Sequence, residues 1–454
     1  MKKRFLGLSV AGAAVAGVAA LSLASCGASD VFHIYAWNTE FQGFFYKYVS
    51  DEKTNDLSKT VHLDGKEVKF TIVPSDNGAY QEALDKALEK NANASPAEKV
   101  DLFLAEADYI LKYTDSAYTK DVSNLKYTDA NGTATKVNFS DCYQYTVEAS
   151  SDKNGVIKGA SFQCCPAGVI YRRSIAKAVL GVDTPEEVQA KIDSWEKFNS
   201  VAAQMKTKGY YMTASFAETY RAFSNNVAKP WVDANGKLQF DDQINAWMDQ
   251  AETFVQNQYT LTSGIWDTET TNEMKKNGKA FCYFGPAWYY NFCMGPAQEG
   301  ADNSFGDWGL VEGPASYFWG GTWMLAATGG DDDNLVAKTI NAFTIDTTVT
   351  RNLAFNENQF VNSKKVNAAV SGYYDAMEEG NKFLGGQNDT KLYLEGAKKI
   401  KFQNQTIYDQ YCNEGLQNKF QEYLKGASGV TKAVALNNFR DYIKEKCPTV
   451  NTAA

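Results

Sequence analysis

Histidine is scarce in this chain of 454 residues, since only His33 and His62 occur. Their position near the start, together with the lack of a Gly-x-Ser-x-Gly motif, argues against a serine hydrolase triad. The cysteines match no zinc-binding spacing, and the three consecutive aspartates at 331–333 are interpreted as a solvated turn rather than a calcium loop. We therefore expect no metal ion and no cofactor.

After residues 1–25 no apolar run is long enough to span a bilayer. That first segment has a basic start at residues 2–4 and an apolar stretch at 5–23, which is typical of an export signal. It ends in Leu-Ala-Ser-Cys26 and resembles the bacterial lipobox, in which the cysteine is lipidated and becomes the mature N-terminus. The alternative is a cleaved signal followed by a chance cysteine. We expect a protein held on the extracytoplasmic face of the cell membrane through lipid alone.

Basic residues are outnumbered by acidic ones, and the formal net charge is −9. It becomes −12 without residues 1–25, which carry three basic residues and no acid. This charge argues against nucleic acid or an anionic membrane surface as partner. Seven cysteines follow Cys26; disulfide pairing in an exported protein and buried free thiols are equally open interpretations. They are Cys142, Cys164, Cys165, Cys282, Cys293, Cys412 and Cys447.

The early part of the chain alternates strand, helix and strand. Apolar runs at 31–37, 68–73 and 100–105 predict strands, and an amphipathic helix begins near Tyr80. This order predicts an α/β fold with a parallel sheet, and the length predicts two domains or lobes. Ligands bind at the carboxyl ends of such strands, although a single loop carboxylate there is more often a solvated charge or a helix cap. The candidates at these ends are Trp37, Glu40, Asp76, Glu106 and Asp108.

Large aromatic rings gather between Lys279 and Ala327 among Gly-Pro and Gly-Gly turns. Turns of this kind can hold rings at the mouth of a pocket. Flat rings beside polar groups suit the face and rim of a sugar. The alternative is that the rings belong to the hydrophobic core. We favour a site that includes Trp288 and Trp319.

The motifs IYAWN, VDLFLAEADY, GVIYRR, GDWGLVEGP and FWGGTWMLAA occur in this order. In order and spacing the chain resembles the extracellular solute-binding proteins of family 1, the carbohydrate-binding lipoproteins of ABC importers, with the maltose-binding proteins as distant relatives. The resemblance implies a two-lobed periplasmic-binding-protein-like fold (type II) with lobes made of discontinuous segments. The expected segments are 26–158 plus 312–356 for one lobe and 159–311 plus 357–454 for the other. Hinge strands would cross near Lys158, Val311 and Asn356.

The same resemblance implies a monomer, not an enzyme, that binds a sugar or oligosaccharide and delivers it to the ABC permease subunits. The chain departs from the maltose-binding pattern at two positions. Gln163 stands where that pattern has a glutamate. The last platform tryptophan of the pattern is absent, and Tyr408 or Tyr411 could replace it. Positions that match the ligand contacts of the maltose-binding pattern are added to the candidates at the strand ends. The predicted ligand-binding residues are Trp37, Glu40, Asp76, Glu106, Asp108, Gln163, Glu218, Tyr220, Trp288, Trp319, Gly320 and Trp323.

Two other functions use the same residue types. Carboxylates with aromatic rings also bind polyamines, so a receptor for a polyamine or another small solute is the main alternative. An exported glycosidase needs two carboxyl groups that face each other across one bond, and no such pair is recognisable in the sequence.

Overall fold

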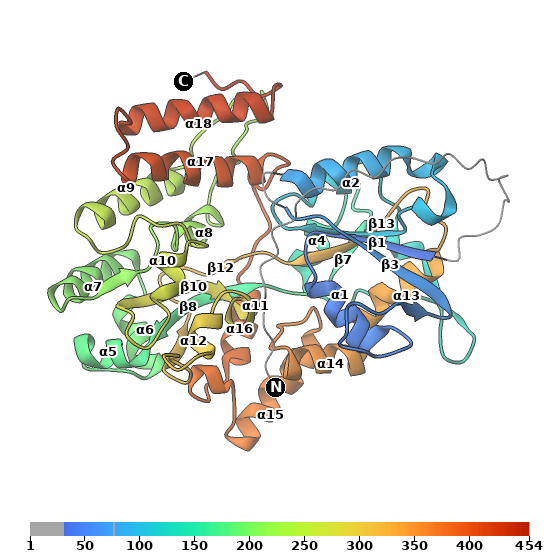
Figure 1. Cartoon of the computed structure of the whole chain (residues 1–454), viewed down its shortest axis with the longest axis horizontal. Coiled ribbons are helices and arrows are strands. Elements are labelled where there is room, and N and C mark those ends of the chain that lie inside the picture. The colour runs from blue at the N-terminus through green and yellow to red at the C-terminus, as the bar shows by residue number, and fades with distance from the viewer. Residues whose placement is uncertain (1–30, 76–77, 454) are drawn as a thin grey trace.

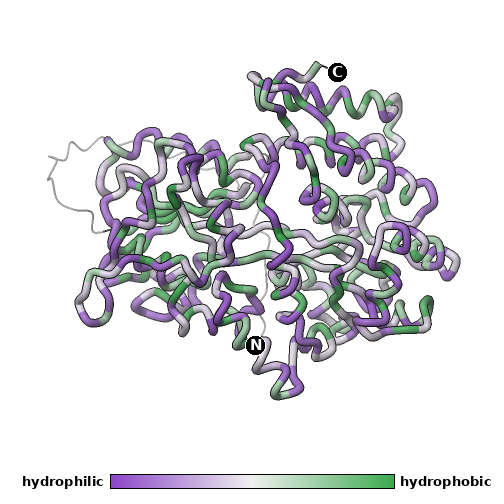
Figure 2. The backbone as a smooth tube through the Cα atoms, turned by 180° about the vertical axis from the view of Figure 1, so that it is seen from behind, coloured by the Kyte–Doolittle hydropathy of each residue, from purple (hydrophilic) through white to green (hydrophobic). Residues whose placement is uncertain are grey.

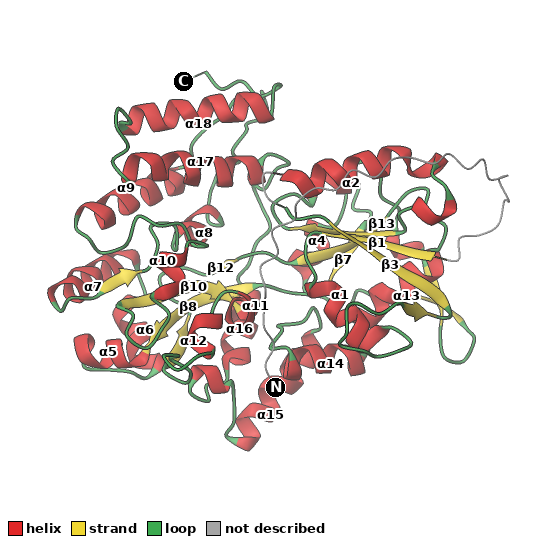
Figure 3. Cartoon of the chain, in the orientation of Figure 1, coloured by secondary structure: helices red, strands yellow, loops and turns green. Residues whose placement is uncertain are grey.

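Two β-sheets, each covered by its own helices, form the two halves of the molecule (Figures 1 and 3). The computed structural model describes residues 31–75 and 78–453. Cys26 and Asp76 lie outside these ranges. Within them, no helix is both long enough and apolar enough to cross a membrane.

The first lobe is built on a six-stranded sheet with the order β2-β3-β1-β4-β13-β7. β1 runs parallel to β3 and β4, which confirms the predicted parallel sheet, and β13 joins antiparallel to β4 and β7. The strands span β1 (Val31–Ala36), β2 (Val61–Leu63), β3 (Lys66–Ile72), β4 (Leu102–Glu106), β7 (Gly159–Ser161) and β13 (Thr322–Ala326).

Helices cover both faces of this sheet, and its central strands β1, β4 and β13 are accordingly buried along most of their length. Leu102 and Leu104 of β4 pack with α1 and α13, whereas Phe103 and Ala105 pack with α2 on the opposite face. A small hairpin, β5 (Lys126–Thr128) and β6 (Ala134–Lys136), contacts α13. The helices are α1 (Glu40–Phe44), α2 (Ala79–Lys90), α3 (Leu111–Thr114), α4 (Gln144–Ala149), α13 (Asp333–Thr344), α14 (Thr347–Asn356) and α15 (Lys364–Met377).

The second lobe has a five-stranded sheet with the order β11-β8-β10-β9, to which β12 adds by pairing with β8. Its core strand β10 is buried along its whole length, as expected of a strand covered on both faces. The strands are β8 (Pro166–Arg172), β9 (Tyr211–Thr213), β10 (Ala280–Pro286), β11 (Trp308–Val311) and β12 (Tyr317–Phe318).

Helices of the second lobe form two groups. One covers the sheet; it includes α7, which begins after Ser194, because the Ser194 hydroxyl accepts from the Lys197 N–H at 3.3 Å and caps the first turn. The other group, α9, α17 and α18, has a core of its own. The helices are α5 (Arg173–Leu180), α6 (Pro185–Ile192), α7 (Trp195–Thr207), α8 (Tyr220–Ser224), α9 (Asp242–Gln256), α10 (Thr268–Asn272), α11 (Ala287–Phe292), α12 (Gly295–Gln298), α16 (Asp389–Ala397), α17 (Asp409–Leu424) and α18 (Lys432–Lys446). Seen from behind, hydrophobic stretches run through the interior of both lobes (Figure 2).

Three extended segments lie side by side where the lobes join: residues 162–165, 319–322 and 360–362. The N–H of Phe162 donates to the carbonyl of Thr322, that of Cys164 to Phe360, and that of Trp319 to Cys165. Three crossings were expected near Lys158, Val311 and Asn356, and the strand pairings shift each of them a few residues along the chain. β7 belongs to the first sheet, so the crossing lies after Ser161 rather than at Lys158; β12 belongs to the second sheet, so the return follows Phe318 rather than Val311.

The third crossing also differs from the expected position near Asn356. Residues 360–362 run in the hinge, but α15 then returns to the first lobe, where Val366 and Val370 pack in its core. Phe383, further along, packs in the core of the second lobe. A helical pattern alone does not tell which of two cores a helix covers, and this explains the error.

All seven cysteines in the described ranges are buried free thiols. Burial raises the pKa of each thiol, which disfavours the reactive thiolate. The interpretation as core thiols therefore fits the structure.

Candidate functional site

A cleft of about 690 Å³ lies between the two lobes. Its volume falls in the range of ligand pockets. The first lobe and the hinge contribute Trp37, Asn38, Glu40, Pro74, Ser75, Glu106, Asp108, Tyr109, Gln163, Gly320, Gly321 and Thr322. The second lobe contributes Phe216, Ala217, Tyr220, Arg221, Gly264, Ile265, Trp266, Trp288, Phe292, Trp319, Gln410, Glu414, Gln417, Asn418 and Gln421.

The first lobe meets the cleft with the carboxyl ends of its parallel strands. Trp37 follows β1, Ser75 follows β3, and Glu106 ends β4. These strands are neighbours in the sheet, so their ends bring together residues that are far apart in the sequence. Trp37 packs edge-on against the buried ring of Tyr80 at 5.7 Å, which holds its indole in place.

An aromatic wall faces them from the second lobe; we use this name for Trp266, Trp288, Phe292 and Trp319. The Trp288 indole N–H donates to the carbonyl of Trp319 at 3.2 Å, and the two rings lie 5.1 Å apart. Trp266 lies 5.8 Å from Trp319 and remains 60% exposed, and Phe292 is 62% exposed. Exposed rings of this size, fixed by neighbouring rings, offer a flat apolar surface to a ligand.

Gly320 and Gly321 shape the turn after this wall. Both have positive φ, +79° and +114°, which side chains other than glycine rarely adopt. A Cβ on Gly320 would also lie 3.4 Å from the Trp288 indole nitrogen and 3.6 Å from a Glu106 carboxyl oxygen. The glycines therefore leave room between the aromatic wall and the acidic side chains.

Two carboxyl groups of the cleft have raised pKa values. Burial raises the pKa of Glu40 to about 7, against the opposing effect of a hydrogen bond from Gln163 at 3.2 Å. Burial, followed by the nearby charge of Asp108, raises the pKa of Glu106 to about 8. Near neutral pH these groups can therefore both donate and accept hydrogen bonds.

Asp108 and Arg221 form an ion pair within the cleft. The two guanidinium nitrogens Nη1 and Nη2 donate to Oδ1 and Oδ2 at 2.7 and 2.6 Å. Burial alone would lower the pKa of Arg221, but the charge of Asp108, its hydrogen bonds and the charge of Glu106 together outweigh burial, and the pKa is raised. Since both Asp108 oxygens accept from Arg221, this carboxylate is less available to a ligand than the sequence suggested.

Nine predicted residues meet in the cleft: Trp37, Glu40, Glu106, Asp108, Gln163, Tyr220, Trp288, Trp319 and Gly320. Trp323 does not line it; this ring is 1% exposed and its indole N–H donates to the Thr146 carbonyl inside the first lobe. Glu218 does not line it either and is 2% exposed. It accepts from the Phe284 N–H at 3.1 Å, and its other oxygen, Oε1, has no hydrogen-bond partner among the described residues.

Several cleft residues were missed. Arg221 lies next to predicted Tyr220 on α8, but its role depends on Asp108 of the other lobe. The polar residues of α17 recur at positions 410, 414, 417 and 421, a spacing that places them on one helix face and could have been recognised. Tyr408 and Tyr411, the suggested replacements for a platform ring, are not among the lining residues. Trp266 lies outside the aromatic-rich stretch at 279–327, and no motif in the sequence marks it as a cleft residue.

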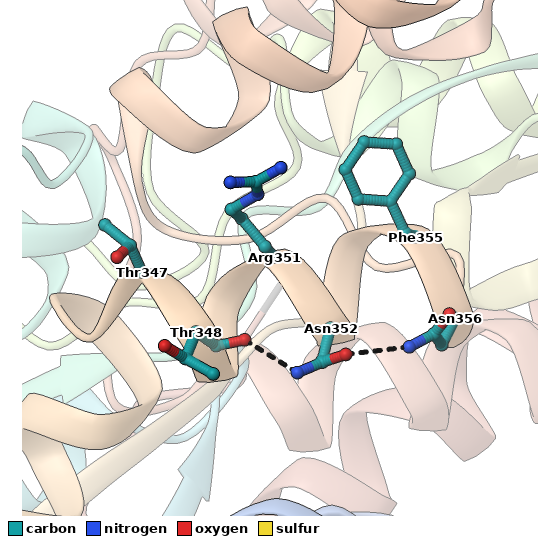
Figure 4. Close-up of a pocket in the computed structure, with 6 residues that line it drawn as sticks. All are labelled: Thr347, Thr348, Arg351, Asn352, Phe355 and Asn356. Atoms are coloured by element: carbon teal, nitrogen blue, oxygen red, sulfur yellow. Dashed lines mark hydrogen bonds between the residues drawn. The ribbon is translucent and has the colours of Figure 1, made fainter.

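A second depression, of about 430 Å³, lies along α14 (Figure 4). All six of its lining residues come from this one helix; Asn352 donates to the Thr348 carbonyl and accepts from Asn356, both at 2.9 Å. These bonds stay on the helix surface and face no opposing wall. In the described ranges, no three potential metal ligands come together.

The sequence model of the bacterial extracellular solute-binding proteins matches residues 61–355, more than half of the chain. The chain belongs to this family. The family assignment confirms the resemblance seen in the sequence and indicates an extracytoplasmic location. Members of this family are binding proteins. No curated protein sequence matches the chain.

Solved structures share the fold of this solute-binding protein at low sequence identity. A crystal structure of an extracellular solute-binding protein of family 1 has a TM-score of 0.67 and 15% identity, and the alignment covers 93% of this chain and 100% of that one. An ABC transporter associated binding protein from B. animalis subsp. lactis, in complex with beta-1,6-galactobiose, has a TM-score of 0.61 and 16% identity over 93% and 100%. The galacto-N-biose/lacto-N-biose I-binding protein of Bifidobacterium longum, with lacto-N-biose, has a TM-score of 0.64 and 12% identity over 94% and 98%. The two-lobed α/β fold is therefore confirmed.

Proposed function

We propose that this solute-binding protein captures a neutral sugar or oligosaccharide between its lobes and delivers it to the permease of an ABC importer. The observation that carries the proposal is the cleft itself, with an aromatic wall on one lobe and carboxyl and carboxamide groups on the other side and on α17. Ring faces can stack on the apolar C–H patches of a sugar, while the polar groups bond its hydroxyls.

The charges favour a ligand without net charge. Among the described lining residues, Arg221 is the one cationic side chain, and Asp108 neutralises it. Glu40 and Glu106, with pKa values of about 7 and 8, are largely protonated at mildly acidic pH. Carboxamides supply much of the remaining polar surface. The sugars named for the two structural neighbours support the same class.

The polyamine alternative also has an observation in its favour. Four acidic side chains line the cleft beside the aromatic wall: Glu40, Glu106, Asp108 and Glu414. A cation would lower the raised pKa values of Glu40 and Glu106, so its binding would release protons and strengthen as pH rises.

Thermal shift measurements would decide between these functions. A ligand that binds only the folded state raises the melting temperature. We therefore expect neutral disaccharides and trisaccharides to raise it, and putrescine, spermidine and uronic acids to leave it unchanged. Calorimetry would then give the affinity of the best sugar. Stabilisation by polyamines alone would replace the proposal, and release of chromophore from nitrophenyl glycosides would show a glycosidase instead.

The lobes that take part in this function are proposed to comprise residues 31–161, 322–356 and α15 on one side, with the remaining described segments on the other. Cys26 lies outside the described residues, and its lipidation is part of the proposal. Cys26→Ala should abolish labelling by a fatty-acid analogue in cells. A variant that remains labelled would contradict the lipid anchor.

A further inference from the structure

The Asp108–Arg221 ion pair joins the two lobes. Asp108 follows β4 of the first lobe, and Arg221 lies on α8 of the second, 113 residues further along the chain. Both oxygens of the carboxylate meet both terminal nitrogens of the guanidinium, which is the strongest geometry for such a pair. The side chains are 10% and 17% exposed, so water and salt screen the pair only weakly.

Both partners are held in place by their own lobes. The N–H of Asp108 donates to a Glu106 carboxyl oxygen at 2.8 Å, which fixes the turn after β4. The Arg221 guanidinium carbon lies 5.9 Å from the centre of the Trp319 ring in the aromatic wall. A movement of one lobe relative to the other must therefore break or stretch this pair.

A second contact between the lobes lies at another part of the cleft. Gln81 of α2 donates to Gln410 of α17 at 2.5 Å, and both side chains are buried. The ends of these two helices approach each other across the gap between the lobes in Figure 1. This bond joins two neutral groups, which makes it the weaker of the two contacts.

We propose that Asp108 and Arg221 form a clasp that favours the closed arrangement of the lobes even without ligand. The three hydrogen-bonded hinge segments leave rotation about the hinge as the available motion. The clasp shifts this rotation toward the closed arrangement before any ligand contact is made. Arg221 is then a positioning residue, since it acts by bringing the aromatic wall toward the acidic strand ends.

The clasp should also affect affinity, an expectation that rests on the proposed function. Apparent affinity falls in proportion to the fraction of molecules in the binding-competent arrangement. Loss of the clasp should weaken sugar binding about 5- to 150-fold, the usual range for coupling between conformation and binding. The closed arrangement itself can be measured without any ligand, so failure of this inference and failure of the proposed function remain distinguishable.

Small-angle X-ray scattering on the ligand-free protein provides the test. Asp108→Asn and Arg221→Gln should each increase the radius of gyration, and the double variant should resemble either single one, because both changes remove one interaction. The matched control is Asp307→Asn, which breaks the Arg172–Asp307 pair, at 2.9 Å, inside the second lobe. This control should keep the radius of the unchanged protein.

Melting temperature and far-ultraviolet circular dichroism on the same samples would show that each variant is folded. A folded Asp108→Asn and a folded Arg221→Gln with the unchanged radius would overturn the clasp. An increase in the double variant equal to the sum of the two single increases would overturn it as well, because the residues would then act independently. A radius that grows equally in Asp307→Asn would show general loosening and not a clasp.

Discussion

Replacing Trp266 with alanine should separate ligand binding from folding. The indole is 60% exposed, so the fold gains little from its burial, whereas it lines the cleft beside Trp319 at 5.8 Å and Phe292 at 6.3 Å. A large exposed ring in a cleft, supported by two other rings, is available to stack on a sugar. We therefore expect Trp266→Ala to reduce sugar affinity while it leaves stability nearly unchanged.

The magnitude follows from the exposed area of the ring. A tryptophan presents about 250 Å², of which the exposed fraction leaves about 150 Å², and a ligand on one face would cover about half. At about 25 cal/mol per Å² this contact contributes about 2 kcal/mol, or roughly a 30-fold loss of affinity in the alanine variant. The free energy of unfolding should change by less than about 0.5 kcal/mol, as for other surface substitutions.

Calorimetry with the best neutral sugar would measure the affinity, and urea unfolding would measure the stability. Trp266→Phe should recover part of the loss, because a smaller ring still stacks. The matched control is Phe305→Ala: Phe305 is 50% exposed on the same lobe, 5.9 Å from Phe383, and does not line the cleft. Unchanged affinity in Trp266→Ala, or an equal loss in Phe305→Ala, would refute the reasoning.

Three further substitutions test neighbouring parts of the same lobe. Trp288→Ala should weaken sugar binding by about 1–3 kcal/mol in calorimetry. It should also lower the melting temperature, because the ring is half-buried and its N–H donates to the Trp319 carbonyl. Intact binding with a large loss of stability would assign Trp288 to the core. Gly285→Ala should cost about 1–3 kcal/mol in urea unfolding, because its Cβ would lie 2.4 Å from the Tyr289 ring; wild-type stability would show that this ring moves freely. Burial raises the pKa of Glu218 to about 8, so the protonated side chain contributes fully to stability below about pH 4.5 and this contribution is lost as pH rises toward 8. Glu218→Gln should therefore make the melting temperature fall less between pH 5 and 9. Identical profiles of melting temperature against pH in the two proteins would contradict this.

Local patterns predicted the first lobe well because its elements depend on residues close in the sequence. The apolar run at Val31–Ala36 forms β1, and the amphipathic helix predicted to begin near Tyr80 is α2. The parallel order of β1, β3 and β4 then brings Glu106 to the cleft as a matter of topology. Trp319 and Gly320 were found because Gly-Gly turns beside rings are visible in the sequence.

The errors concern contacts that only the complete fold creates. Trp319 and Trp323 are four residues apart, yet one lines the cleft and the other packs inside the first lobe, since β13 begins between them. Glu218 and Arg221 are three residues apart, and the buried turn before α8 points only the second toward Asp108. No periodicity distinguishes these pairs, because the difference depends on the position of a distant strand or lobe.

The antiparallel pairing of β4 with β13 has a consequence for biogenesis. Ala105 lies opposite Trp323, so the first sheet cannot be completed until more than two hundred further residues, including most of the second lobe, have left the ribosome. Such distant pairings require a long loop to close before any contact is gained, which slows folding. A chain that acts outside the cytoplasm gains time from this delay, since it can reach the export machinery before its central strands meet.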